Sequence, residues 1–241
     1  SGKSTLIMQL NALLRPDSGS VVIDGRDIHA DRSRLKEVRR SVGLVFQYPE
    51  HQLFEATIAK DIAFGPENLG LGKDEVQERV AWAMDLVGLP ADTAEKSPFD
   101  LSGGQKRRAA IAGVLAMRPK ILILDEPAAG LDPRGRDEIL NNVKELHAKL
   151  GITVILVSHS MEDVARLVNR IIVINKGRIA MDGPPGDIFA KPDILENMGL
   201  AAPQAANLAH NLRARGFAVP EDAYTVEAVT EAIIKRLRER K

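Results

Sequence analysis

Two short, continuous apolar runs limit most strongly what this chain can fold into. They cover residues 121–124 and 154–157, and a polar residue follows each of them. Strands without polar alternation are typical of a parallel sheet that is buried on both faces. Parallel strands need a crossover, and residues 133–150 carry a helical pattern between the two runs. The sequence therefore predicts an α/β fold with a mainly parallel sheet covered by helices.

Further elements are expected on both sides of these runs. Residues 42–46 predict another strand, and residues 171–181 predict a hairpin that turns at a Lys-Gly pair. Residues 48–118 carry helical patterns, such as those of residues 73–87 and 104–117, and no clear strand. We therefore expect residues 48–118 to form a helical insertion between core strands.

The pattern changes after about residue 190. A helix is expected to start near residues 201–203 and to end near Gly216. Thr225 is the expected N-cap of a last amphipathic helix, with four apolar residues on one face. These are Val226, Val229, Ile233 and Leu237. The sequence thus predicts a main domain of residues 1–190 and a small helical extension of residues 191–241.

Composition argues against several classes of function. The 33 Lys and Arg residues balance the 33 Asp and Glu residues, which gives no electrostatic reason to expect nucleic acid or an anionic membrane as the main partner. The absence of cysteine excludes disulfides, thiolate metal sites and cysteine catalysis, and it fits a reducing compartment. No stretch approaches the roughly 18–20 apolar residues that a membrane-spanning helix needs.

The first residues, Ser1-Gly2-Lys3-Ser4-Thr5, match the end of the phosphate-binding loop G-x-x-x-x-G-K-[ST]. In such a loop, backbone N–H groups hold the phosphates, Lys3 would reach the β- and γ-phosphates, and Ser4 would bind Mg²⁺. Four residues are a weak signal, and an ordinary flexible terminus is the alternative. Because the front of the loop and the strand before it are missing, we expect a truncated N-terminus and poor ATP binding by this chain alone.

A second candidate lies where the apolar run 121–124 ends in Asp125-Glu126-Pro127. A buried strand would deliver Asp125 to its tip, where the carboxylate can hold a Mg²⁺ shell. Glu126 would sit just outside, where it can polarise an attacking water. A strand that ends in solvated acids is the alternative. In combination with Gly-Lys-Ser, the pattern favours nucleotide hydrolysis.

The decisive element is Leu101-Ser102-Gly103-Gly104-Gln105. A Ser and two glycines are expected to precede a helix that starts at Gln105, so that exposed amides, the hydroxyl and the helix dipole form a second anion site. One ATP does not need two such sites from one subunit. We therefore expect this site to bind the γ-phosphate of an ATP held by a partner subunit, and a helix N-cap with a glycine turn is the alternative.

With these motifs, the sequence resembles the ATP-binding subunits of ABC transporters over nearly its whole length. The matching motifs, in order, are the end of the phosphate loop, Gln47 after a strand, residues 101–105, Asp125-Glu126, Ala129-Gly130-Leu131-Asp132, and His159 after a strand. The resemblance implies a P-loop NTPase core, an ATPase activity, and ATP and Mg²⁺ as ligands.

The resemblance also implies roles for three further residues. Gln47 would sense Mg²⁺ and the attacking water and pass that state to a membrane partner. Asp132 would lie at a dimer interface, and His159 would contact the γ-phosphate. Ala128 stands where the family often has Thr, a small change that we expect to be tolerated. The aromatic residue that stacks on adenine in this family would lie upstream of Ser1.

A narrower resemblance lies in Phe-Gln-Tyr-Pro-Glu-His-Gln-Leu-Phe-Glu at residues 46–55 and Asp-Ile-Ala-Phe-Gly-Pro at residues 61–66. Both look like the ATPase subunits of energy-coupling-factor transporters, the importers of vitamins and transition-metal ions, and most like the second of their two ATPase types. The implied partners are a second ATPase subunit (identical or a paralogue) in a head-to-tail dimer, an integral membrane coupling subunit and a substrate-binding membrane subunit. The implied location is the cytoplasmic face of the cell membrane, without nucleic acid.

Three alternatives stay open. One is the ATPase subunit of another ABC importer. Another is a soluble ABC-type ATPase of DNA repair or chromosome structure. The neutral charge and the short spacing from Gln47 to Leu101, without a heptad run, count against it. The last is an ATP-binding subunit without hydrolysis, which Glu126 and His159 argue against.

Overall fold

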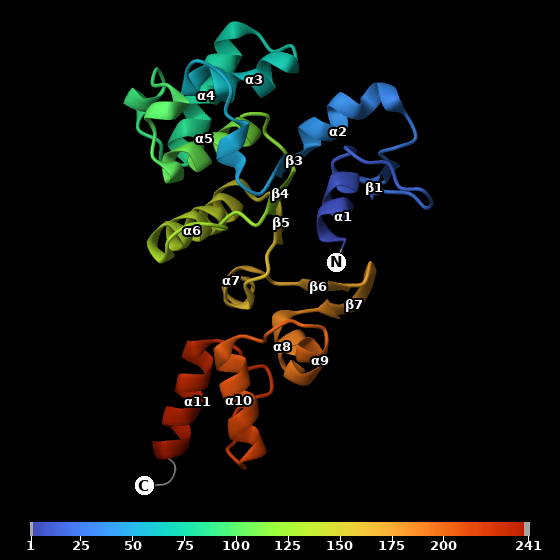
Figure 1. Ribbon diagram of the computed structural model, residues 1–241, viewed down its shortest axis with the longest axis vertical. Helices are drawn as coiled ribbons and strands as arrows, with labels where there is room; N and C mark the ends of the chain where they lie inside the picture. The colour runs from blue at the N-terminus through green and yellow to red at the C-terminus, as the bar shows by residue number, and fades with distance from the viewer. Residues whose placement is uncertain (1, 239–241) are drawn as a thin grey trace. The chain divides into compact units, whose positions relative to one another are not determined.

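The computed structural model describes residues 2–238 (Figure 1). The chain divides into two compact units. The larger unit is Ser4–Val157, and the smaller unit joins Ser158–Lys241 to Ser1–Lys3. The domain boundary expected near residue 190 falls inside the smaller unit and stays a prediction.

The larger unit is built on a parallel sheet. Its three strands are β3 (Val42–Val45), β4 (Ile121–Asp125) and β5 (Thr153–Val157), in the order β3-β4-β5 with β4 in the centre. Helix α6 (Pro133–Leu150) provides the crossover from β4 to β5. The predicted α/β fold with a mainly parallel sheet is confirmed.

Both faces of β4 are buried, as its continuous apolar run predicts. Successive side chains of a strand point to opposite faces. Leu122 and Leu124 belong to a core that includes residues of α3, α4, α5 and α6, whereas Ile123 belongs to a separate core with Ile7 of α1 (Lys3–Leu10). All three β4 side chains are 0% exposed. The central strand therefore holds helices on both sides of the sheet.

The predicted helical insertion is confirmed, and the described residues between β3 and β4 contain no strand. Three α-helices gather there around the larger core (Figure 1). The elements are η2 (Pro49–Gln52), α3 (Ile58–Asn68), α4 (Lys73–Leu86), η3 (Ala91–Thr93), η4 (Pro98–Asp100) and α5 (Gly103–Leu115).

The segment between α1 and β3 completes the larger unit. Strands β1 (Val22–Ile23) and β2 (Arg26–Asp27) form an antiparallel hairpin. The short helices η1 (Arg32–Arg34) and α2 (Leu35–Ser41) follow it and lead directly into β3.

The smaller unit contains the predicted hairpin and the C-terminal helices. Strands β6 (Ile171–Asn175) and β7 (Arg178–Gly183) pair antiparallel. The N–H of Ala228 donates to the Thr225 hydroxyl at 3.2 Å, which confirms the predicted N-cap of the last helix. On that helix Val229 is buried, but Val226 and Leu237 near its two ends are exposed. The helices are α7 (Met161–Leu167), α8 (Pro185–Phe189), α9 (Pro192–Asn197), α10 (Gln204–Ala214) and α11 (Val226–Arg238).

Within residues 2–238, no helix has the length and apolar character needed to cross a membrane.

A close approach between β3 and the helical insertion requires glycine at position 43. A Cβ built on Gly43 would lie 2.5 Å from Val114 Cγ1 and 3.2 Å from Pro119 Cγ. Real Cβ atoms do not come so close to a neighbour, so any larger side chain must push the strand and α5 apart. Gly43 therefore sets the distance between β3 and the helix that carries Ser102 at its start.

We predict that Gly43→Ala lowers the free energy of unfolding by about 1–3 kcal/mol, because overpacking a close-packed core costs this much. Gly72→Ala is the control, since a Cβ there would meet nothing within 4 Å. Its effect should stay below about 1 kcal/mol, the cost of replacing glycine by alanine at the N-cap of α4 without any steric clash. Urea unfolding of both variants measures this difference, and equal losses would contradict the steric argument.

Candidate functional site

The start of α1 and the end of β4 meet in the larger unit. The Ser4 hydroxyl donates a hydrogen bond to Asp125 Oδ2 at 3.4 Å, although the two residues are 121 positions apart in sequence. Ser4 lies in the first turn of α1, and Asp125 is the last residue of β4 and is 8% exposed. The structure thus joins two residues that were assigned to Mg²⁺ from separate motifs.

The first turn of α1 contains the rest of the predicted phosphate loop. Lys3, Ser4 and Thr5 are its first three residues, and Gly2 precedes them with a φ of 95°. Gly2 and Lys3 fall in the smaller unit, so their part in the site stays a prediction. The first N–H groups of a helix lack partners within the helix and attract anions. The hydroxyl and carboxylate oxygens of Ser4 and Asp125 are hard ligands, and Mg²⁺ is commonly bound by one or two carboxylates together with phosphate oxygens. The donor set therefore fits Mg²⁺ held jointly with a nucleotide.

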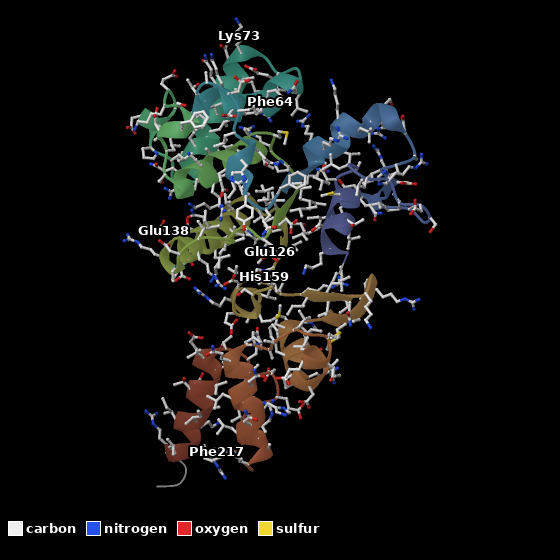
Figure 2. The ribbon with its side chains drawn as sticks, in the orientation of Figure 1. Phe64, Lys73, Glu126, Glu138, His159 and Phe217 are labelled. Atoms are coloured by element: carbon white, nitrogen blue, oxygen red, sulfur yellow. The ribbon has the colours of Figure 1, made fainter. Side chains whose placement is uncertain are left out.

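Glu126 leaves the sheet in a strained conformation. Its φ is 51°, in the left-handed region that few non-glycine residues adopt. The backbone is held there because the Glu126 N–H donates to the Val157 carbonyl of β5 at 2.9 Å. This turn carries the chain out of the sheet directly after Asp125, and Figure 2 labels the Glu126 side chain there. Backbone strain of this kind is concentrated at functional sites.

Gln47 follows β3 at the same end of the sheet at which Glu126 follows β4. Val45 and Leu124 are paired in the parallel register, and Gln47 and Glu126 each come two residues after their member of this pair. Gln47 is exposed. His159 comes two residues after the end of β5 but belongs to the smaller unit, so its part in the site stays a prediction.

The predicted second anion site starts with a capping box at α5. The Gln105 N–H donates to the Ser102 hydroxyl at 3.3 Å, and the Ser102 N–H donates to Gln105 Oε1 at 3.0 Å. Because this reciprocal pair caps the helix at Ser102, α5 begins at Gly103. The expectation that both glycines precede a helix starting at Gln105 is therefore wrong: they form its first turn.

Nothing within the larger unit requires glycine at positions 103 and 104. A Cβ at either position would meet no atom within 4 Å, and neither residue has a positive φ. Glycine inside a helix costs about 0.5–1 kcal/mol relative to alanine. Among the described residues, the N–H groups of Gly103 and Gly104 also have no acceptor outside α5. The first turn of α5 is therefore an open, amide-lined surface.

Asp132 has a structural role in its own unit. It is the N-cap of α6, and its carboxylate accepts a hydrogen bond from the Gly135 N–H at 2.7 Å. The residue is exposed, so the side chain is accessible from outside the unit. Its place at a dimer interface stays a prediction.

Comparisons with known proteins agree with this geometry. The family model described as ABC transporter matches residues 1–129. The energy-coupling factor transporter ATP-binding protein EcfA2 of Caldanaerobacter subterraneus subsp. tengcongensis is 58% identical, over 99% of this chain and 83% of the relative. The chain belongs to the ABC transporter family of ATP-binding proteins. Its resemblance to the energy-coupling-factor group and to the second ATPase type is confirmed.

Two solved structures show the same fold. The structure of cbiO1 from Clostridium perfringens, described as part of the ABC transporter complex cbiONQ, has a TM-score of 0.73 and 40% identity, over 86% of this chain and 82% of that chain. The ATP-binding cassette MJ0796, described as a dimer in a post-hydrolysis state bound to ADP and Pi, has a TM-score of 0.66 and 28% identity, over 76% of this chain and 80% of that chain.

In this ABC ATPase, Arg107 of α5 is a buried charged residue to which the sequence motifs assign no role. It is 1% exposed, and its guanidinium donates to both carboxylate oxygens of Glu50, at 3.1 and 2.8 Å. It also donates to the carbonyls of Pro127 and Ala129, each at 3.0 Å. Its helical spacing is the signal that could have predicted its burial: Arg107 lies four residues before Ile111, on the buried face of α5.

The Arg107–Glu50 pair changes the acidity of the Glu50 carboxyl group. Burial of Glu50 opposes its ionisation, but the hydrogen bonds and charge of Arg107 outweigh this effect and hold the pKa of Glu50 below its ordinary value of 4.5. A carboxyl group whose folded-state pKa is lowered stabilises the fold above its unfolded-state pKa. This contribution is lost as the pH falls through the folded-state pKa.

We predict that Glu50→Gln lowers the free energy of unfolding at pH 7 by about 1–3 kcal/mol, because the charge of Arg107 then lacks its buried counterion. The difference from the parent should shrink as the pH falls from the ordinary pKa of Glu50 through its lower folded-state pKa, since only then does the parent carboxylate become protonated in the folded protein as well. Urea unfolding at a series of pH values between 7 and 3 measures this trend. A difference independent of pH would contradict it.

Proposed function

We propose that this ABC ATPase binds and hydrolyses ATP with Mg²⁺ and thereby powers uptake of a vitamin or a transition-metal ion through an energy-coupling-factor membrane transporter. The observation that carries the proposal is the Ser4–Asp125 hydrogen bond, because it joins the predicted phosphate loop to the predicted metal ligand that directly precedes Glu126. The relative EcfA2 is named for the energy-coupling factor transporter, and cbiO1 for a complex with further subunits, which supports the transport role.

One half of the proposed site lies within a single subunit. The amides of Gly2, Lys3, Ser4 and Thr5 at the start of α1 bind the phosphates, and the Lys3 ammonium reaches the β- and γ-phosphates. Ser4 and Asp125 hold Mg²⁺. Bound there, the ion would neutralise charge that develops between the β- and γ-phosphates.

Hydrolysis is proposed to depend on positioning rather than on a covalent intermediate. Glu126 accepts a hydrogen bond from the attacking water, which forms its bond to the γ-phosphorus as the bond to the ADP oxygen breaks. Gln47, at the same edge of the sheet, orients the water and the Mg²⁺ shell. His159 donates a hydrogen bond to the γ-phosphate. Each group stabilises charge that develops in the transition state.

The other half of the site is proposed to come from a second ATPase subunit, identical or a paralogue, in a head-to-tail dimer. The open first turn of α5 supplies the Ser102 hydroxyl and the amides of Gly103 and Gly104 to the partner's γ-phosphate, with Gln105 closing the cap. Asp132 lies at the dimer interface. The dimeric MJ0796 structure with ADP and Pi supports this arrangement, since that protein shares the fold.

The membrane coupling subunit is proposed to bind the segment between Gln47 and Phe64, and a separate membrane subunit to bind the transported substrate. Phe54 and Phe64 form an exposed edge-to-face pair with ring centroids 4.9 Å apart (Figure 2 labels Phe64). Asp61 accepts hydrogen bonds from the N–H groups of Phe54 and Glu55, which fix this pair in place. Such a contact would hold the ATPase at the cytoplasmic face of the membrane.

We predict that Glu126→Gln lowers the kcat for ATP hydrolysis by about 100-fold or more in the intact transporter, since losing a group that polarises the water costs at least this much. ATP binding should persist, so the ATP-bound closed dimer should accumulate. Steady-state hydrolysis and size-exclusion chromatography with ATP measure the two effects. A variant that hydrolyses ATP at the parent rate would show that Glu126 has another role.

We also predict that Gly104→Ala separates function from folding. The change should leave the free energy of unfolding unchanged or raise it by up to about 1 kcal/mol, because alanine is the better helix former. The added methyl group should obstruct the partner's γ-phosphate and lower hydrolysis at least tenfold. Gly72→Ala, at another open position, is the control and should keep the parent rate. Parent activity of Gly104→Ala would contradict the partner-facing role.

A further inference from the structure

Three segments that carry proposed functional residues meet at the guanidinium of Arg107. Arg107 itself belongs to α5, one turn after Ser102 and Gly103. Its first partner, Glu50, lies in η2, three residues after Gln47. Its other two partners are the carbonyls of Pro127 and Ala129, in the loop that runs from Glu126 to the N-cap of α6.

Tyr48 makes a second contact between the segment after Gln47 and the loop after Glu126. Tyr48, in a left-handed conformation with a φ of 56°, packs against Gly130, where a Cβ would lie 3.3 Å from Tyr48 Cε1. The Tyr48 ring also stacks on His51 of η2, with centroids 5.8 Å apart. The segment after Gln47 therefore contacts the loop after Glu126 both through Arg107 and directly.

The chemistry of this junction makes its parts move together. The guanidinium is planar and rigid, and it is almost fully buried. Removing one partner of a buried ion pair leaves an uncompensated charge, which is strongly unfavourable. A displacement of Pro49–Gln52 therefore has to carry α5 and the loop of residues 127–129 with it. It need not move the Ser4–Asp125 pair, which Arg107 does not touch.

We propose that Arg107 and Glu50 are positioning residues that transmit movement of the membrane-facing segment to the partner-facing surfaces at Ser102–Gly104 and Asp132. This inference rests on the proposed function. Neither residue contacts ATP. The pair sets where the first turn of α5 and the N-cap of α6 stand when two subunits close, so its loss slows closure and hydrolysis without weakening ATP binding to the subunit's own phosphate loop.

The chain offers a matched control in the same helical insertion. Arg79 of α4 is 4% exposed, donates to Glu75 at 3.1 and 2.7 Å, and donates to the Ala116 carbonyl at 3.2 Å. It has the same chemistry as Arg107, a buried guanidinium on a carboxylate and a backbone carbonyl. Its partners, however, are Glu75 of its own helix and Ala116, the C-cap at the end of α5 away from Ser102, so among the described residues its hydrogen bonds reach neither η2 nor the loop of residues 127–129.

The experiment compares Glu50→Gln and Arg107→Lys with Glu75→Gln and Arg79→Lys in the intact transporter reconstituted in vesicles. The kcat and the KM for ATP are measured together with substrate uptake per ATP hydrolysed and the melting temperature. Glu50→Gln and Arg107→Lys should lower kcat at least tenfold, change KM less than twofold and lower uptake per ATP. The two control variants should keep kcat and KM within twofold of the parent at a comparable change in melting temperature.

A double variant, Glu50→Leu with Arg107→Met, separates positioning from stability. It removes the ion pair without leaving a buried charge, so the melting temperature should recover relative to Glu50→Gln. The kcat should stay low, because the hydrogen bonds that join the three segments are gone. Recovery of kcat along with stability would overturn the proposal, as would a Glu50→Gln variant with kcat within twofold of the parent.

A parallel measurement of Glu126→Gln keeps the two proposals distinguishable. If Glu126→Gln is inactive while Glu50→Gln hydrolyses ATP and drives uptake at parent rates, the ATPase function stands and the positioning role of the pair fails. If Glu126→Gln is as active as the parent, the proposed catalytic role of Glu126 fails. The positioning role of the Arg107–Glu50 pair is then judged separately, by comparing the kcat of Glu50→Gln with that of Glu75→Gln.

Discussion

The burial of β4 on both faces is the constraint on which the rest of the larger unit depends. Leu122 and Leu124 face one core and Ile123 faces the other, so a shift of one residue would turn each side chain toward the wrong layer. This fixed register decides where the strand ends. It places Asp125 within hydrogen-bond reach of Ser4, at the point where the apolar core gives way to polar partners. A buried carboxylate is tolerated there because it is hydrogen-bonded.

The two surfaces proposed to bind phosphate, at the starts of α1 and α5, differ in how their serine hydroxyls are engaged, and this difference fits the proposal of a site shared between subunits. In the first turn of α1, the Ser4 hydroxyl reaches across the unit to Asp125. In α5, the Ser102 hydroxyl stays within its own helix, where the capping box engages it with Gln105. The first surface is therefore completed by its own subunit. The second has open space above both glycines, and no contact among the described residues explains the free-energy cost of two glycines in a helix.

The sequence predicted most of the fold and the motif residues, because both depend on short-range pattern. The apolar runs located β4 and β5, and Thr225 marked a helix start, since period and capping are local. The start of α5 was misplaced because either Ser102 or a later residue can cap a helix that opens with two glycines. The contacts of Arg107 could not be predicted from the sequence, because they are not local. Its carboxylate partner lies 57 residues away, and no local pattern states which buried charge meets which carboxylate.

Backbone strain is found in both segments that follow β3 and β4 at the carboxyl end of the sheet. Strand β3 is followed by Phe46, Gln47 and Tyr48, and β4 is followed directly by Glu126. Tyr48 and Glu126 are both non-glycine residues with a left-handed backbone. Such residues cost of order 1–3 kcal/mol each and persist only where the surroundings hold them. Here the surroundings are the Val157 carbonyl for Glu126 and the junction at Arg107 for the segment of Tyr48. Glu126 and the residue after Gln47 therefore stand where contacts with neighbouring segments hold the backbone, and the buried Arg107–Glu50 pair is one of the contacts that hold the segment of Tyr48.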